Sequence, residues 1–68
     1  MKHEPINPDS VYSREEAAEL LGVSLSTVKR LIASGQLVAS RPESIRRIFI
    51  QGSSILQMLE ETKIEVDR

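Results

Sequence analysis

The sequence predicts a mainly α-helical domain with a small β-hairpin, in the order helix, helix, strand, strand, helix. Two short segments with the apolar spacing of helices are separated by the turn sequence GVS. Two runs rich in β-forming residues follow, on either side of the sequence PES, and a third helical segment comes after them. The 68 residues are enough for one small domain and no more.

The first helix is expected to begin at Arg14, because Ser13 and Glu16 have the spacing of a capping box. Alanine and leucine residues between positions 17 and 21 supply its apolar side. Gly22 is expected to end the helix, since glycine readily adopts the backbone conformation that a tight turn requires.

The second helix is expected to follow Ser24, whose side chain can cap it, and to end before Gly35. Helical spacing places Val28, Leu31 and Ile32 on one face, which should belong to the core. The opposite face carries only small, polar or basic side chains, so nothing on it obstructs close approach to a groove. Its residues are Ser26, Thr27, Lys29, Arg30, Ala33 and Ser34.

The runs QLVASR and IRRIFI are expected to pair as a two-stranded hairpin around the turn PES. Side chains alternate along a strand, so Ile48 and Ile50 should share a face that turns toward the core. Arg46 then lies near the tip of the hairpin, where the strand extends beyond the core.

The third helix is expected to begin after Gly52, with Ser53 or Ser54 as its cap. Its apolar residues, which should pack on the first two helices, are Ile55, Leu56, Met58 and Leu59. The predicted organisation is a mobile leader at residues 1–11, one folded domain at 12–61 and a charged tail at 62–68.

The composition argues against several classes of function. The chain has no cysteine, and its one histidine, His3, lies in the leader, so neither a metal site nor a catalytic base is expected. No apolar run is long enough to span a membrane and no secretion signal is present, which predicts a cytoplasmic protein without a membrane partner. We therefore expect no enzymatic activity, no cofactor and no small-molecule substrate.

The net charge of −1 conceals a strong segregation of charge along the chain. Residues 24–47 hold five of the nine basic residues and a single acid, whereas the segments before and after them are acidic. Such a local excess of positive charge is what contact with a polyanion requires. The alternative is an ordinary solvated surface with scattered charges.

Four residues reproduce the spacing A-x-x-x-G-x-S-x-x-x-V of a helix-turn-helix: Ala18, Gly22, Ser24 and Val28. The longer string SREEAAELLGVSLSTVKRLIASGQL, followed by RRIFI and SSILQML, resembles the excisionase-type, MerR-like winged helix-turn-helix domains. The resemblance covers residues 12–60. It implies that the second helix enters the major groove of double-stranded DNA and that the hairpin rests on the adjacent backbone or minor groove.

The resemblance also marks candidate DNA contacts on the second helix and the hairpin. Arg30 is the central candidate for reading a guanine, and Lys29 is expected to meet a phosphate. The amides that follow Ser13 are expected to hold a phosphate oxygen, with the acidic residues of the first helix pointing away. The full candidate set is Ser13, Arg14, Ser24, Ser26, Thr27, Lys29, Arg30, Arg41, Arg46 and Arg47.

Proteins that this chain resembles act as recombination directionality factors. They bind beside the attachment site of a phage or mobile element, bend the DNA and bias the integrase toward excision. The resemblance thus implies double-stranded DNA and an integrase as partners. The small surface of a single copy also predicts cooperative binding with further copies of the chain. Two alternatives stay open: a small MerR-like transcriptional regulator, and a protein-binding adaptor that uses Ile45 and Phe49. Leu25 and Phe49 depart from the family pattern, which commonly has basic or polar residues there.

Overall fold

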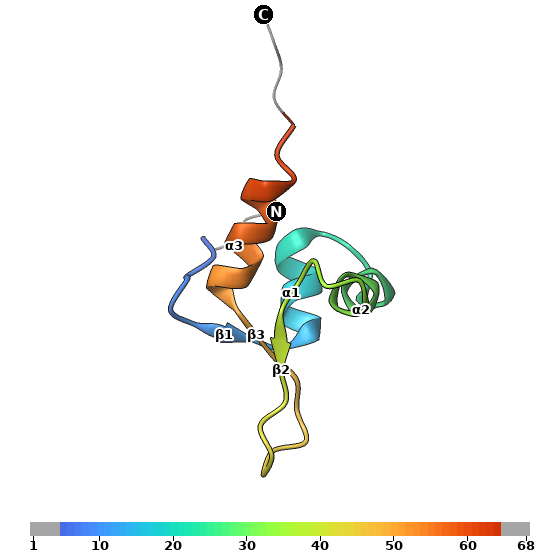
Figure 1. Ribbon diagram of the computed structural model, residues 1–68, viewed down its shortest axis with the longest axis vertical. Helices are drawn as coiled ribbons and strands as arrows, with labels where there is room; N and C mark the ends of the chain where they lie inside the picture. Colours follow the sequence, from blue (N-terminus) through green and yellow to red (C-terminus); the bar gives the residue numbers. More distant parts are fainter. Residues whose placement is uncertain (1–4, 65–68) are drawn as a thin grey trace, which may run out of the picture.

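The computed structural model describes residues 5–64 and folds them into three helices and a small antiparallel sheet (Figure 1). This agrees with the predicted mainly helical class. The elements are β1 (Val11–Tyr12), α1 (Arg14–Leu21), α2 (Leu25–Ala33), β2 (Ala39–Ser40), β3 (Phe49–Gln51) and α3 (Gly52–Glu61). Residues 1–4 of the expected leader and 65–68 of the expected tail lie outside the described residues.

The helix boundaries follow the local signals of the sequence. Ser13 and Glu16 form the predicted capping box: the Glu16 amide donates to Ser13 Oγ at 3.0 Å, and the Ser13 amide donates to Glu16 Oε1 at 2.8 Å. Gly22 ends α1 with φ of +70°, in the left-handed region. Ser24 caps α2 by accepting a hydrogen bond from the amide of Thr27 at 3.1 Å.

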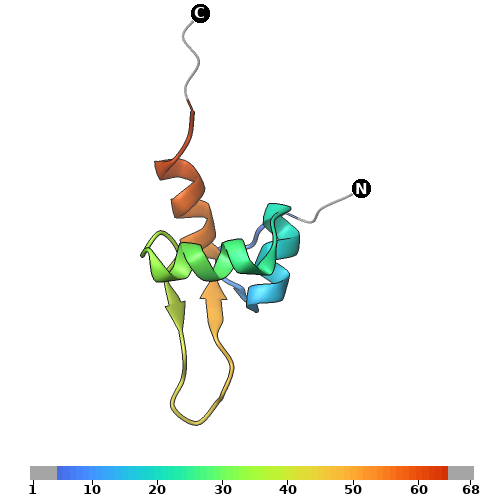
Figure 2. The same ribbon diagram turned by 90° about the vertical axis from the view of Figure 1, so that its right-hand side faces the viewer.

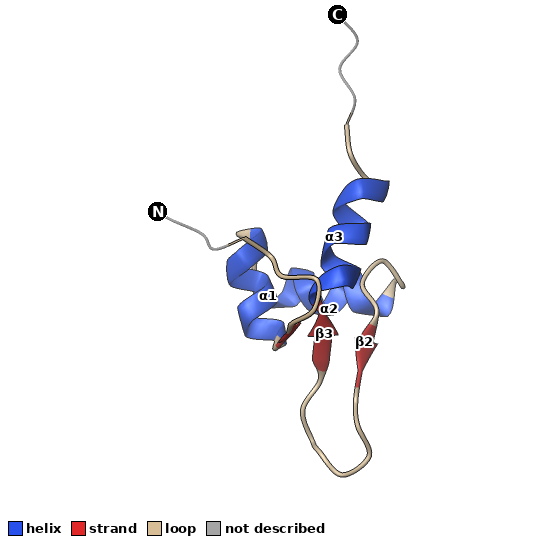
Figure 3. Ribbon diagram, turned by 90° about the vertical axis from the view of Figure 1, so that its left-hand side faces the viewer, coloured by secondary structure: helices blue, strands red, loops and turns tan. Residues whose placement is uncertain are grey.

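The sheet has three strands where the sequence predicts two. Its order is β1-β3-β2, with β3 in the centre and both neighbours antiparallel to it (Figure 3). The register pairs Tyr12 of β1 and Ala39 of β2 with the same residue, Ile50. A strand of two residues is too short to display a periodic pattern, which is why the sequence does not reveal β1.

The hairpin between β2 and β3 is also more irregular than predicted. Its turn is closed by a hydrogen bond of 3.1 Å from the Ile45 amide to the carbonyl oxygen of Pro42. Only Arg41 connects β2 to this turn, whereas residues 46–48 connect the turn to β3. Because the two connections differ in length, antiparallel pairing does not extend into them, and residues 41–48 form a projecting loop (Figure 2).

The segment before β1, expected to be mobile, is anchored to the start of α3. The amides of Gly52 and Ser53 donate to the carbonyl oxygens of Ser10 and Pro8, at 2.8 and 3.2 Å. The side chain of Ile6 packs against the core, although its own position is half-buried. Residues 5–10 are therefore part of the folded domain.

These leader carbonyls take the place of the side-chain cap that the sequence predicts for α3. The N-cap residue is Gln51, and it makes no capping hydrogen bond through its side chain. The prediction of Ser53 or Ser54 as the cap is wrong, since Ser54 Oγ instead accepts a hydrogen bond from the Val38 amide at 2.9 Å. Backbone groups distant in sequence satisfy the amides that a local cap would have satisfied.

A single core joins all the elements. Its fully buried side chains are those of Ala17, Val28, Leu37, Ile50 and Ile55. α3 contributes through one narrow side, made by Ile55 and Met58. Leu56 and Leu59, which the sequence assigns to the packed face, are 38% and 42% exposed, since the buried side of α3 is limited to Gly52, Ile55 and Met58.

Gly52 is the position at which the leader comes closest to α3. A Cβ atom placed there would collide with the backbone carbonyl of Asn7, and no flexible side chain is available to move aside. We therefore predict that Gly52→Ala lowers the free energy of unfolding by about 1–3 kcal/mol, despite the higher helix propensity of alanine. Urea denaturation followed by circular dichroism measures the loss.

The neighbouring variant Ser53→Ala is the control for Gly52→Ala. Ser53 is exposed and donates to the leader through its amide, which alanine retains. It should change the free energy of unfolding by no more than about 0.5 kcal/mol. A Gly52→Ala protein as stable as the unaltered chain would contradict the close packing of the leader on α3.

Candidate nucleic-acid interface

The orientation of α2 is set by the turn that connects it to α1. The amide of Val23 donates to the carbonyl of Ala18 at 3.0 Å, immediately after the left-handed residue Gly22. Val28, one turn into α2, is fully buried in the core that contains Ala17 and Ala18. With one face of α2 held in the core, the opposite face is directed outward.

The outward face of α2 holds the side chains that the sequence predicts for it. Its exposed residues are Ser26, Lys29, Arg30, Ala33 and Ser34, and Thr27 is half-buried. The Oγ of Ser24 lies 3.0 Å from Oγ1 of Thr27, so one of these two hydroxyls donates to the other. One proton of the pair is left to donate to another molecule.

The hairpin supplies a second group of cations beside α2. Arg41, Arg46 and Arg47 are all exposed and all lie in the projecting loop. Figure 2 shows α2 running across the base of the hairpin, with the loop extending beyond it. The cations of α2 and those of the hairpin therefore come from neighbouring elements.

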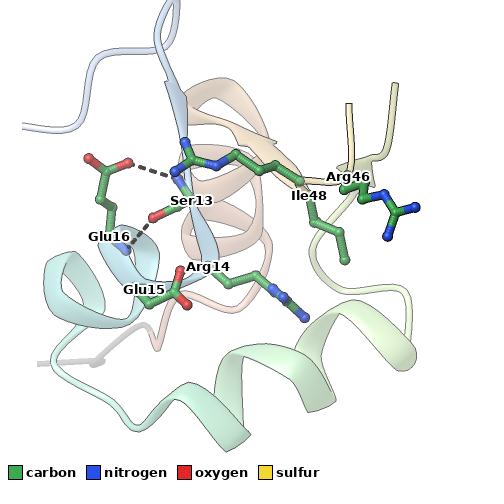
Figure 4. Close-up of a pocket in the computed structure, with 7 residues that line it drawn as sticks. Ser13, Arg14, Glu15, Glu16, Arg46 and Ile48 are labelled. Atoms are coloured by element: carbon green, nitrogen blue, oxygen red, sulfur yellow. Dashed lines mark hydrogen bonds between the residues drawn. The ribbon is translucent and has the colours of Figure 1, made fainter. Parts of the chain in front are cut away.

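Arg14 lies in a different setting from the other candidate cations. It is half-buried at the first position of α1, beside a hollow of about 450 Å³ between this helix start and the returning arm of the hairpin (Figure 4). We call this the arginine hollow. It is lined by Ser13, Arg14, Glu15, Glu16, Arg46, Arg47 and Ile48.

The β1 strand explains why these residues meet. Tyr12 pairs with Ile50 in an antiparallel register, so the chain that follows Tyr12 runs alongside the chain that precedes Ile50. This places Arg14 close to Ile48 and to the hairpin arginines. The sequence predicts each of these arginines as a DNA contact but does not bring them together, because the signal for β1 is absent from it.

The sequence predicts that the acidic residues of α1 point away from the DNA-binding region. Two of them instead lie beside the arginines. Glu15 and Glu16 line the arginine hollow together with the arginines. Glu16 is held there because its carboxylate accepts the hydrogen bond of the Ser13 amide in the capping box. The same box occupies the Glu16 amide, which leaves only the amides of Arg14 and Glu15 at this helix end for an anion.

The candidate cations form no ion pair with any acidic group of residues 5–64. Within residues 5–64 the single ion pair joins Lys63 Nζ to Glu60 Oε2 at 3.4 Å, on the far side of the domain. The basic residues without an ion pair in this part of the chain are Arg14, Lys29, Arg30, Arg41, Arg46 and Arg47. Charge is therefore separated along the molecule, because Glu60 and Glu61 of α3 lie at the end opposite the hairpin (Figure 1).

The two apolar residues considered for an adaptor surface differ in exposure. Ile45, at the tip of the hairpin, is 43% exposed. Phe49 is half-buried in β3, where it pairs with Ser40 of β2. The pair therefore does not form a continuous exposed apolar surface.

Residues 5–64 contain no group of three or more histidine, cysteine, aspartate or glutamate residues that is arranged to hold a metal ion. None of the helices in this part of the chain has the length and apolar character needed to span a bilayer.

The sequence was compared with protein families, curated proteins and solved structures. The family model described as "Helix-turn-helix domain" matches residues 11–63, which include every element of the fold. No curated protein and no solved structure matches the chain significantly.

Proposed function

The chain belongs to this DNA-binding helix-turn-helix family, and from that premise we propose that α2 enters the major groove of double-stranded DNA while the hairpin contacts the adjacent backbone or minor groove. α2 has nine residues, and an α-helix with its side chains is about 10–12 Å in diameter, which suits a groove about 12 Å wide. The turn at Gly22 and the burial of Val28 keep the opposite side of α2 open to the groove.

The observation that carries this proposal is the unpaired state of the basic residues. A guanidinium or ammonium group that has no carboxylate partner within the protein is available to a phosphate or a base edge. These groups come from α1, α2 and the hairpin, and the only paired one in the described chain is on the segment after α3. The overall charge of −1 therefore does not oppose DNA binding at this surface.

Within α2 we assign different roles to the two basic residues. Arg30 lies on the same face as Ser26, one turn further along, and its guanidinium can donate two parallel hydrogen bonds to a guanine. Lys29 is displaced toward the side of that face, where the phosphate backbone bounds the groove. Arg30 then contributes specificity, and Lys29 contributes affinity that does not depend on the sequence.

Substitution of these two residues tests the assignment. We expect Arg30→Ala to weaken binding to the preferred duplex by about 1–3 kcal/mol and to relax the preference at one base pair. Lys29→Ala should weaken binding to all duplexes alike, since it removes a phosphate contact. Fluorescence anisotropy with the selected duplex and its single-base variants measures both effects.

Lys63→Ala is the control for the Arg30 and Lys29 variants, because Lys63 is paired with Glu60 and follows α3. Its affinity for every duplex should equal that of the unaltered chain. If Arg30→Ala and Lys29→Ala lose affinity equally and without regard to sequence, Arg30 does not read a base.

We further propose that the protein acts as an excisionase, a recombination directionality factor that binds several adjacent sites, bends the DNA and biases an integrase toward excision. A single copy of this size buries only about 600–1,000 Å² on DNA, so useful affinity requires neighbouring copies or a partner. The separation of charge favours a head-to-tail contact, with the acidic end of one copy against the basic hairpin of the next.

An excision assay tests this finer role. The integrase and the two attachment ends of the same element are incubated with and without the protein, and the recombined product is quantified. We expect the protein to stimulate excision and Arg30→Ala to reduce the stimulation. Repression of a nearby promoter without any effect on excision would contradict the excisionase role and favour a transcriptional regulator.

A further inference from the structure

We propose that the arginine hollow is the seat of one phosphodiester group of the DNA backbone, which Arg14, Arg46 and Arg47 hold jointly. The inference rests on the proposed DNA binding and adds a specific ligand to it. It differs from a general basic surface because residues from α1 and from the hairpin would act on the same phosphate rather than on separate ones.

Arginines from two separate elements, α1 and the hairpin, line the same concave site. Figure 4 shows Arg14 and Arg46 extending to the same side of the protein, on either side of Ile48. Arg14 follows soon after β1, and Arg46 and Arg47 shortly precede β3, so the pairing of β1 with β3 brings the two segments together. The fold therefore gathers these residues before a ligand binds.

The second argument is the half-buried position of Arg14. Burial removes part of the hydration of a charged group, which is unfavourable unless another charge compensates. Neither Arg14 nor the two hairpin arginines has an ion pair within residues 5–64. An anion in the arginine hollow would compensate the half-buried charge of Arg14, and the exposed side chains of Arg46 and Arg47 are free to contact the same anion.

The third argument concerns which anion fits. The lining contains three guanidinium groups and the carboxylates of Glu15 and Glu16, so its net charge is one positive. This matches the single negative charge of a phosphodiester. A phosphate dianion would leave an excess negative charge beside the two carboxylates. The lining is therefore matched in charge to an internal DNA phosphate.

The test uses duplexes in which one backbone phosphate at a time is replaced by an uncharged methylphosphonate. For the unaltered protein, one position should lower the affinity by about tenfold, as expected for loss of a charged hydrogen-bonding partner. Arg14→Gln and Arg46→Gln should each reduce the sensitivity at that same position. The loss of binding free energy in the double variant should be smaller than the sum of the two single losses, because both residues share one ligand.

Two controls accompany these variants. Arg41→Gln removes a hairpin arginine that does not line the hollow, so it should weaken binding yet keep the sensitivity at that position. Glu15→Gln should increase the affinity for the unmodified duplex, since it removes a negative charge beside the phosphate. Circular dichroism of each variant establishes that it is folded.

Different outcomes separate this inference from the function on which it rests. If Arg14→Gln and Arg46→Gln changed the sensitivity at different phosphates, and their losses of affinity were additive, the two arginines would not share one phosphate. That result would overturn this inference and leave the proposed DNA binding intact. Saturable binding of inorganic phosphate to the free protein below about 1 mM, followed by NMR, would assign the hollow to free anions and overturn the inference as well. Absence of duplex binding by the unaltered protein would contradict both proposals.

Discussion

The placement of Val28 in the core is the constraint on which the rest of the structure depends. This side chain is fully buried with Ala17 and Ala18, and small residues on α1 are what allow the two helices to approach closely. Gly22 makes the approach possible by turning the chain through a left-handed residue. Once these contacts form, the face of α2 that carries Arg30 is directed to solvent, and its availability to DNA follows from packing on the other face.

The features that the sequence predicts correctly are those with local causes. The capping box at Ser13, the left-handed turn at Gly22 and the cap at Ser24 each depend on residues within a few positions of one another. The features that it misses depend on distant contacts. Strand β1 exists because Tyr12 meets Ile50, and α3 is capped by carbonyl groups from the leader rather than by one of its own serines.

The same distinction applies to the candidate interface. The excess of basic residues in the middle of the chain is visible in the sequence, as is their spacing on the second helix. The arginine hollow is not visible in the sequence, because Arg14 and Arg46 belong to segments that only the three-stranded sheet brings together. The sequence also does not show that Glu16 lines the hollow, although it does predict the capping box that holds its carboxylate.

In the proposed complex, cations that have no ion-pair partner within residues 5–64 neutralise the phosphates of duplex DNA. The salt dependence of affinity for a selected duplex measures this most directly, because each neutralised phosphate releases condensed counterions. Four or five phosphate contacts predict a slope of about −4 for the logarithm of the association constant against the logarithm of salt concentration. A slope near zero would contradict the account and would point to a partner other than a polyanion.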